Sequence, residues 1–198
     1  MPCKFCHGIV YTKPRVLYLD TEVSASLGAY YPPRYDTNIL WTEQEWRFLC
    51  FSYAWDDSKV QNVHNANEKK MVMAMRELID QCDLLVCHNV AYDLGKFYAK
   101  CLEYQIPPPR PFKTFCTLMK YRRLAKFESN KLGDLGEKLG FGDKVELTGK
   151  KFWRQVMAGD KKSIKKMIIY CNKDVTLLRH LHKTISPFFP PMRFKIVK

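Results

Sequence analysis

An apolar run that ends in two carboxylates one residue apart is the feature that most constrains the fold of this chain. Residues 15–24 read Arg-Val-Leu-Tyr-Leu-Asp-Thr-Glu-Val-Ser. Side chains on a β-strand alternate between its two faces, so Asp20 and Glu22 point one way and Thr21 the other. Two adjacent carboxylates repel each other unless they are solvated at a strand end or share a divalent cation. This segment alone leaves both interpretations open.

A second apolar run ends in polar residues in a similar way. Residues 83–89 read as a short buried strand that ends at His88 and Asn89, and a helical pattern follows from about residue 92 to residue 103. Asp93 is therefore expected just past a strand end, at the start of a helix. An Asp at that place is also commonly an N-cap, which is the structural alternative to a catalytic role.

The rest of the pattern alternates between strands and helices. Residues 24–41 are rich in Pro and aromatic residues and are expected to form a loop, whose tyrosines could stack on bases or pack on the domain. The order predicts an α/β fold with a central mixed β-sheet flanked by α-helices. Further strands are expected at 46–55, 60–64 and 112–118, and helices at 67–82, 119–127, 132–139, 152–157 and about 160–185.

The charge of the chain indicates a polyanionic partner. The 198 residues carry 33 Lys and Arg against 20 Asp and Glu, a net charge of +13, which favours nucleic acid over a membrane surface. The absence of an 18-residue apolar run and of a signal-peptide pattern predicts a cytoplasmic protein. We expect one domain at 15–187, with an amino-terminal extension at 1–14 and a basic, Pro-containing tail at 188–198.

Most of the eight cysteines lie in apolar stretches and are expected to be reduced and buried. The exception is Cys3-Lys-Phe-Cys6-His7, which matches a c-type haem attachment sequence and half of a zinc site. Haem attachment would require export, and no second close Cys/His pair follows to complete a zinc site. A loosely docked terminus is the favoured interpretation, and metal binding by Cys3, Cys6 and His7 stays open.

Three segments together carry a specific resemblance. They are Asp20–Glu22, His88–Asp93 and Tyr170–Asp174, and in order and setting they resemble the three motifs of the DEDD family of 3′-to-5′ exonucleases, within the ribonuclease H-like superfamily. The position of Tyr170, four residues before Asp174, resembles the pattern of the DEDDy branch of this family. Including Trp153 and Asp160, the similarity is closest to small exonucleases of phages, which would place the protein in the host cytoplasm. Cys116 stands where relatives often carry Asp.

The resemblance implies a fold, a reaction and a set of site residues. It implies a ribonuclease H-like fold and a hydrolase that removes nucleoside 5′-monophosphates from a free 3′ end, with DNA favoured over RNA. Two Mg²⁺ or Mn²⁺ ions would act together at the scissile phosphate. Four carboxylates without a Cys or His cluster beside them suit these ions over zinc. The metal ligands would be Asp20, Glu22, Asp93 and Asp174, with Tyr170 orienting the attacking water.

Five further residues are candidate substrate contacts. Leu27 and Trp153 could wedge or stack a terminal base, although core packing explains them equally well. His88 and Asn89 are candidates too, although a hydrogen-bonding scaffold explains them better, and Thr21 completes the set. The alternatives to an exonuclease are an inactive nucleic-acid-binding module and an endonuclease or resolvase on the same fold.

Overall fold

The structure is a computed structural model of the chain, and it describes residues 14–30, 39–142 and 149–192. Cys3, Cys6 and His7 lie outside the described residues, so the interpretation of that segment stays a prediction. In the part of the chain that is described, no helix is both long enough and apolar enough to cross a membrane.

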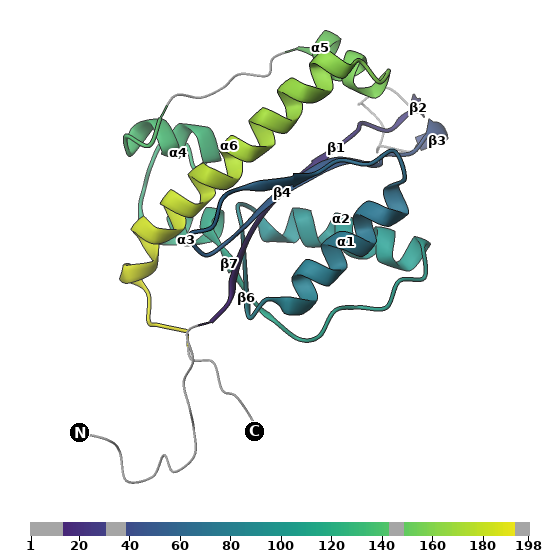
Figure 1. Cartoon of the computed structure of the whole chain (residues 1–198). Helices are drawn as coiled ribbons and strands as arrows, with labels where there is room; N and C mark the ends of the chain where they lie inside the picture. The colour runs from purple at the N-terminus through teal and green to yellow at the C-terminus, as the bar shows by residue number, and fades with distance from the viewer. Residues whose placement is uncertain (1–13, 31–38, 143–148, 193–198) are drawn as a thin grey trace, which may run out of the picture.

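A five-stranded mixed sheet forms the centre of the fold, in the order β5-β4-β1-β6-β7 (Figure 1). The central strand β1 pairs antiparallel with β4 and parallel with β6, which confirms the predicted mixed sheet. The strands are β1 (Val16–Val23), β4 (Phe48–Trp55), β5 (Gln61–Val63), β6 (Leu84–Cys87) and β7 (Lys113–Cys116).

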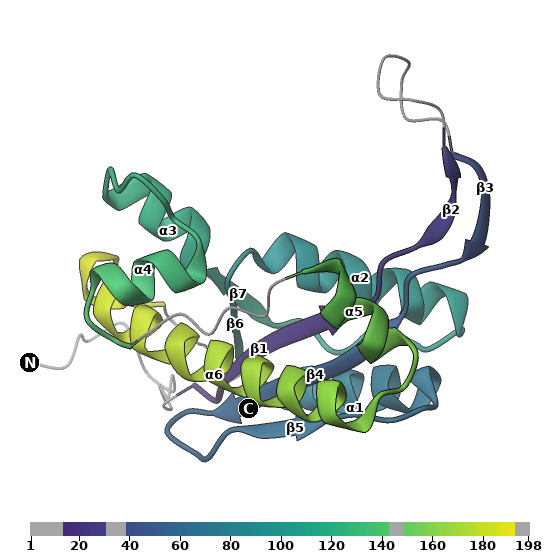
Figure 2. The ribbon, with the colours of Figure 1, turned by 90° about the horizontal axis from the view of Figure 1, so that it is seen from above.

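Helices cover both faces of this sheet (Figure 2). One face packs on α1 (Glu68–Gln81) and α2 (Val90–Glu103), and the other packs on the long helix α6 (Lys161–Ile185). Three short helices contact α6, and a 3₁₀ turn, Ser186–Phe188, follows it. The short helices are α3 (Thr117–Leu124), α4 (Leu132–Lys138) and α5 (Lys150–Met157).

The alternation of β1 assigns its side chains to the two cores. Leu17 and Leu19 pack in the core under α1 and α2, whereas Val16 and Tyr18 pack in the core under α6. By the same period of two, Asp20 and Glu22 lie on the α6 face and Thr21 on the α2 face. The strand continues through both carboxylates to Val23, so they lie within the sheet and not beyond its end.

Two of the helices begin at a residue whose side chain caps the first turn. The side chain of Asn67 accepts a hydrogen bond from Lys70 N at 3.1 Å and begins α1. Asp160 does the same for Ser163 N at 2.8 Å and begins α6. Both satisfy backbone N–H groups that a helix leaves without an internal partner.

The prediction of a loop over residues 24–41 was wrong in its outer parts. Leu27–Tyr30 (β2) pairs antiparallel with Ile39–Gln44 (β3), and the two strands form a separate arm that projects from the sheet (Figure 2). Trp41 and its β-branched neighbours Ile39 and Thr42 are residue types that favour a strand. This preference outweighed the Pro-rich pattern that indicated a loop, although Trp41 is 58% exposed. Tyr31 and Tyr35 lie outside the described residues.

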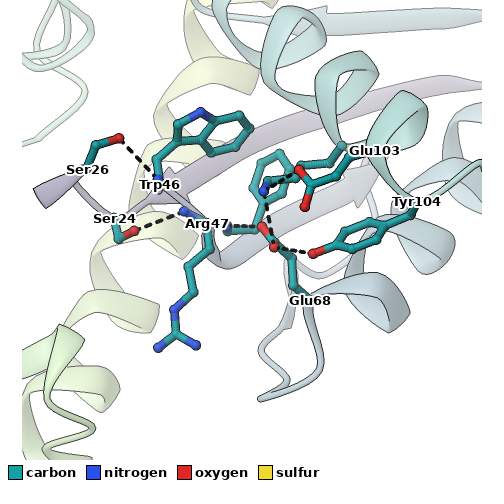
Figure 3. A network of polar contacts seen from close by, with 9 residues as sticks. Ser24, Ser26, Trp46, Arg47, Glu68, Glu103 and Tyr104 are labelled. Carbon is teal, nitrogen blue, oxygen red and sulfur yellow. Dashed lines mark hydrogen bonds and ion pairs between the residues drawn. The ribbon is translucent and has the colours of Figure 1, made fainter. Parts of the chain in front are cut away.

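A polar network holds the base of this arm against the sheet (Figure 3). Ser24 Oγ accepts a hydrogen bond from Arg47 N at 3.0 Å, and Ser26 Oγ accepts one from Trp46 N at 3.1 Å. Next to them, the carboxylate of Glu68 accepts hydrogen bonds from Phe48 N and from the Tyr104 hydroxyl, each at 2.6 Å. These bonds fix the point where the chain returns from the arm into β4.

We expect Met75→Ala to lower the free energy of unfolding by about 2–5 kcal/mol, because Met75 is fully buried and its truncation leaves a cavity. Met73→Ala is the matched control on the same helix. Since Met73 is 45% exposed, its replacement should change stability by no more than about 0.5 kcal/mol. Urea unfolding followed by circular dichroism measures both values, and equal losses would contradict the placement of this face of α1.

Candidate active site

Two of the predicted carboxylates, Asp20 and Glu22, lie side by side on β1 and face α6. Their cross-strand partners on β4 are Ser52 and Cys50. Just after Glu22 the pairing with β4 shifts, so that Leu49 is the extra residue of a β-bulge. Bulges are frequent beside active sites because they redirect a strand locally. Here the bulge lies at the point where β1 leaves the sheet toward the arm.

Asp93 approaches the same strand from the opposite face of the sheet. It lies in the first turn of α2, and one oxygen accepts a hydrogen bond from the Thr21 hydroxyl at 2.8 Å. The N-cap of α2 is Asn89, so the alternative interpretation of Asp93 as an N-cap was wrong. Thr21, predicted as a substrate contact, uses its hydroxyl to hold Asp93 beside the strand that carries Asp20.

The last two residues of the predicted set come from the middle of α6. Tyr170 and Asp174 are one helical turn apart, and their side chains are hydrogen-bonded to each other. Asp174 is close enough to Asp20 and Glu22 to interact electrostatically with both. The structure therefore brings all five residues together at the carboxyl end of β1, from three separate elements.

Burial raises the pKa of every carboxyl group in this cluster, and repulsion from neighbouring charges adds to the shift for Asp20 and Glu22. The pKa of Asp20 lies well above its ordinary value, first because of burial and then because of the charges of Asp93, Glu22 and Asp174. Burial also raises the pKa of Glu22 to about 8, with Cys50, Asp174 and Asp93 adding to the shift. For Asp93 and Asp174, burial raises the pKa to about 7 and about 6, against the lowering effect of their hydrogen bonds.

Two thiols lie beside the carboxylates, and sequence reasoning missed them. Cys171 on α6 is fully buried, and its Sγ is 3.5 Å from both the Oδ2 and the main-chain oxygen of Asp20. The thiol of Cys50 is close enough to that of Cys171 for the two to interact electrostatically. The expectation that no cysteine cluster accompanies the carboxylates was therefore wrong. The available signal was helical spacing, because Cys171 lies three residues before Asp174 on the same face of α6.

His88 and Asn89 form part of the scaffold next to Asp93. His88 lies 2.9 Å from both the Thr117 hydroxyl and the Asn130 main-chain oxygen, and burial lowers its pKa to about 4. The neutral ring therefore links the end of β6 to the segment before α4. Asn89 adopts a left-handed conformation, with φ at 78°, and its exposed side chain makes no capping bond.

Leu27 and Trp153 lie in different surroundings. Leu27 is 46% exposed and belongs to β2, on the arm. Trp153 is partly buried on α5, where it packs with Phe152 against the apolar cluster that includes Val156 and Met167. Trp153 thus contributes to core packing, and its contact with substrate stays a prediction.

An open cleft lies next to Tyr170 and Asp174, between α4 and α6. It has a volume of about 410 Å³, and Lys131, Lys173 and Phe141 contribute to its walls. Ligand sites in proteins commonly measure about 300–1,000 Å³. The two lysines provide positive charge directly beside the carboxylate cluster.

Tyr92 was also missed by sequence reasoning. Its ring is 45% exposed, and its pKa is raised first by burial and then by the charges of Asp93, Glu22 and Asp20. Tyr92 therefore borders the cluster from the α2 side. Its position next to Asp93 in the helical pattern was the available signal.

The sequence model of the RNase H superfamily matches residues 40–186, about three quarters of the chain. The chain belongs to the RNase H superfamily. The match begins after Asp20 and Glu22, so it supports the fold and leaves the two residues of β1 to be judged from the geometry. It confirms the predicted ribonuclease H-like fold.

One solved structure extends the comparison of this RNase H superfamily member. The chain is similar to the family B DNA polymerase from the hyperthermophilic archaeon Pyrobaculum calidifontis, with a TM-score of 0.69 and 12% sequence identity. The likeness covers 89% of this chain and 25% of the polymerase chain, and at this identity it shows the fold alone. No curated protein sequence matches the chain.

The donor set of this RNase H superfamily member fits divalent cations. Four carboxyl groups cannot all ionise at neutral pH in such a buried cluster unless a positive charge compensates them. Hard cations such as Mg²⁺ and Mn²⁺ prefer oxygen ligands of this kind. Asp20, Glu22, Asp93 and Asp174 can therefore hold such ions.

The raised pKa of Glu22 predicts how stability without metal depends on pH. Because its pKa rises from 4.5 to about 8 on folding, the folded protein binds this proton more tightly than the unfolded chain does. The stabilisation is complete below about pH 4.5 and is lost as the pH rises to about 8. Glu22→Gln has no proton to lose at this position and so does not lose this stabilisation. In the presence of a chelator, its melting temperature should therefore increase relative to that of wild type as the pH rises from roughly 5 to 8.

Differential scanning calorimetry at several pH values measures this difference. Glu45→Gln, which removes an exposed carboxylate outside the cluster, controls for the loss of one negative charge. Added Mg²⁺ or Mn²⁺ should raise the melting temperature of wild type more than that of Glu22→Gln. A difference between the two proteins that stays constant with pH would contradict the raised pKa.

Proposed function

We propose that the protein is a metal-dependent 3′-to-5′ exonuclease of the DEDDy type that releases nucleoside 5′-monophosphates, with DNA as the favoured substrate. The observation that carries the proposal is the gathering of Asp20, Glu22, Asp93, Asp174 and Tyr170 at one end of β1. These residues come from three elements and lie up to 154 residues apart in sequence (174 − 20). Membership of the RNase H superfamily supports the same class of chemistry.

The four carboxylates are proposed as the ligands of two Mg²⁺ or Mn²⁺ ions. When bound, such ions supply charge neutralisation at the phosphate and a nucleophilic water near neutral pH. Asp20 is central to this arrangement, because it interacts electrostatically with the other three carboxyl groups. Thr21 fixes the orientation of Asp93 through the 2.8 Å hydrogen bond.

Tyr170 is proposed to orient the attacking water through its hydroxyl group. Burial and the nearby Asp174 and Glu22 charges raise the pKa of this hydroxyl above its ordinary value. The group therefore remains protonated at neutral pH, and while its single hydrogen is donated to Asp174 its oxygen can accept a hydrogen bond from the water. Its bond to Asp174 holds the ring in place on α6.

The cleft between α4 and α6 is proposed to receive the terminal nucleotide. Its volume of about 410 Å³ suits a ligand of that size. Lys131 and Lys173 in its walls can form ion pairs with a phosphate. The net charge of +13 favours the approach of nucleic acid. The proposed catalytic domain spans residues 15–187. The proposal also includes a relationship to the small exonucleases of phages and a location in the host cytoplasm.

We expect Asp20→Asn and Asp174→Asn each to lower the rate of degradation by about 10²–10³-fold or more, because each removes a charge that holds the metal centre. The measurement is a digestion of 5′-labelled and 3′-labelled single-stranded oligonucleotides with Mn²⁺ or Mg²⁺. Stepwise shortening of the 5′-labelled strand identifies a 3′ start. Glu137→Gln, an exposed carboxylate on α4, is the control and should keep the wild-type rate.

The same assay separates the alternative functions. Cleavage of circular single-stranded DNA would identify an endonuclease, and binding without hydrolysis under any metal would identify an inactive module. Parallel DNA and RNA strands, single and double, test the preference for DNA. Full activity of contaminant-free Asp20→Asn would overturn the assignment of the metal site.

Tyr170→Phe should lower the rate by about 10²-fold while leaving metal affinity nearly unchanged, because it removes a group that positions water and not a ligand. Single-turnover digestion measures the rate, and isothermal titration with Mn²⁺ measures the affinity. Tyr98→Phe, on α2 with 38% of its surface exposed, is the matched control. Loss of Mn²⁺ affinity in Tyr170→Phe would instead assign the hydroxyl a structural role.

A further inference from the structure

The buried thiol of Cys171 is directed at the carboxylate cluster. Its Sγ lies 3.5 Å from Oδ2 of Asp20, although its neighbours Leu49, Val156 and Met167 form an apolar cluster that would accept a hydrocarbon side chain. One ligand atom each from Asp20, Glu22 and Cys171 all lie within 4.8 Å of one another. Two oxygens and one sulfur thus face the same small space.

A second thiol supports the first. Cys50 on β4 is the cross-strand partner of Glu22, and the Cys50 thiol is close enough to that of Cys171 for the two to interact electrostatically. Both cysteines are fully buried. Asp20 and Glu22 are only partly buried, so the carboxylates provide the open side through which an ion can enter. Sulfur and oxygen donors therefore come from β1, β4 and α6.

Two carboxylates and a thiol favour a different cation from the one that a set of four carboxylates favours. Mg²⁺ requires oxygen ligands in near-octahedral geometry, whereas Zn²⁺ and related ions accept thiolate and carboxylate together, usually in a tetrahedron. We propose that Asp20, Glu22 and Cys171, with Cys50 beside them, form a mixed oxygen–sulfur site that binds a thiophilic divalent cation such as Zn²⁺ or Cd²⁺. On binding, a metal–sulfur bond forms and the thiol proton is released to solvent.

The site shares Asp20 and Glu22 with the proposed exonuclease centre, and Cys171 adds a sulfur ligand that the four carboxylates lack. An ion bound to Cys171 would occupy Asp20 and Glu22, and so it would compete with Mg²⁺ for them. The proposal does not require the protein to hydrolyse nucleic acid. Its test therefore measures metal–sulfur bonding, and the two proposals can fail independently.

The test is a Cd²⁺ titration of the 198-residue chain, followed by the ultraviolet absorption of thiolate-to-cadmium charge transfer. Cys3→Ser and Cys6→Ser are introduced first, because that Cys-x-x-Cys segment would bind Cd²⁺ itself. In this background we expect a band that saturates at one equivalent. Asp20→Asn should weaken Cd²⁺ binding, which would place the ion at the carboxylates.

Cys171→Ser in the same background should remove most of the band. It should also lower the affinity for Cd²⁺ by at least roughly 10–100-fold, because the loss of an outer-shell partner already costs that much. Cys101→Ser is the matched control, because Cys101 is a buried free cysteine on α2, in the core on the other face of the sheet. It should leave the band and the affinity unchanged. A band that persists in Cys171→Ser, or no band in the background protein, would overturn the proposal.

A second measurement avoids any substitution at position 171. X-ray absorption at the zinc edge of the Zn²⁺-loaded background protein should reveal sulfur at about 2.3 Å from the metal. This result decides the question if Cys171→Ser loses its helical circular dichroism. A shell of oxygen and nitrogen alone would exclude Cys171 as a ligand.

Discussion

Repulsion among four carboxyl groups is the constraint on which the candidate site depends. Asp20 interacts with Glu22, Asp93 and Asp174, and burial adds to the cost of ionising each of them. A cluster of this kind destabilises the fold at neutral pH unless protons or cations compensate it. The surrounding structure must therefore hold the carboxylates together against their own repulsion, and the rest of the architecture can be understood from that requirement.

The sheet supplies the restraint through the alternation of β1. Leu17 and Leu19 anchor one face of the strand in the core under α1 and α2, while Val16 and Tyr18 anchor the other under α6. Because β1 is the central strand and pairs on both sides, its carboxylates cannot turn away from α6. The hydrogen bond from Thr21 to Asp93 extends this control to a residue on the opposite face.

Local periodicity was sufficient to predict most of the framework, whereas the five proposed site residues were singled out by their resemblance to known exonuclease motifs. The period of two placed Asp20 and Glu22 on one face, and the spacing of four placed Tyr170 next to Asp174. The arm was missed because the Pro-rich segment between its strands indicated a loop, and pairing between β2 and β3 depends on contacts across that segment. Cys50 was missed for a related reason, since its place opposite Glu22 depends on the register of two strands joined through the arm.

The global and local charges of the chain act in opposite directions at the site. A net charge of +13 attracts a polyanion from a distance, whereas ionised carboxylates repel a phosphate at close range. Lys131 and Lys173 line the neighbouring cleft, and their positive charges reduce this repulsion. Because a bound cation favours the phosphate and a bound phosphate favours the cation, occupation of the two sites must be coupled, and by thermodynamic linkage the coupling is the same in both directions. The carboxylate cluster would therefore make binding of a phosphate at this end of β1 depend on whether a cation is bound there.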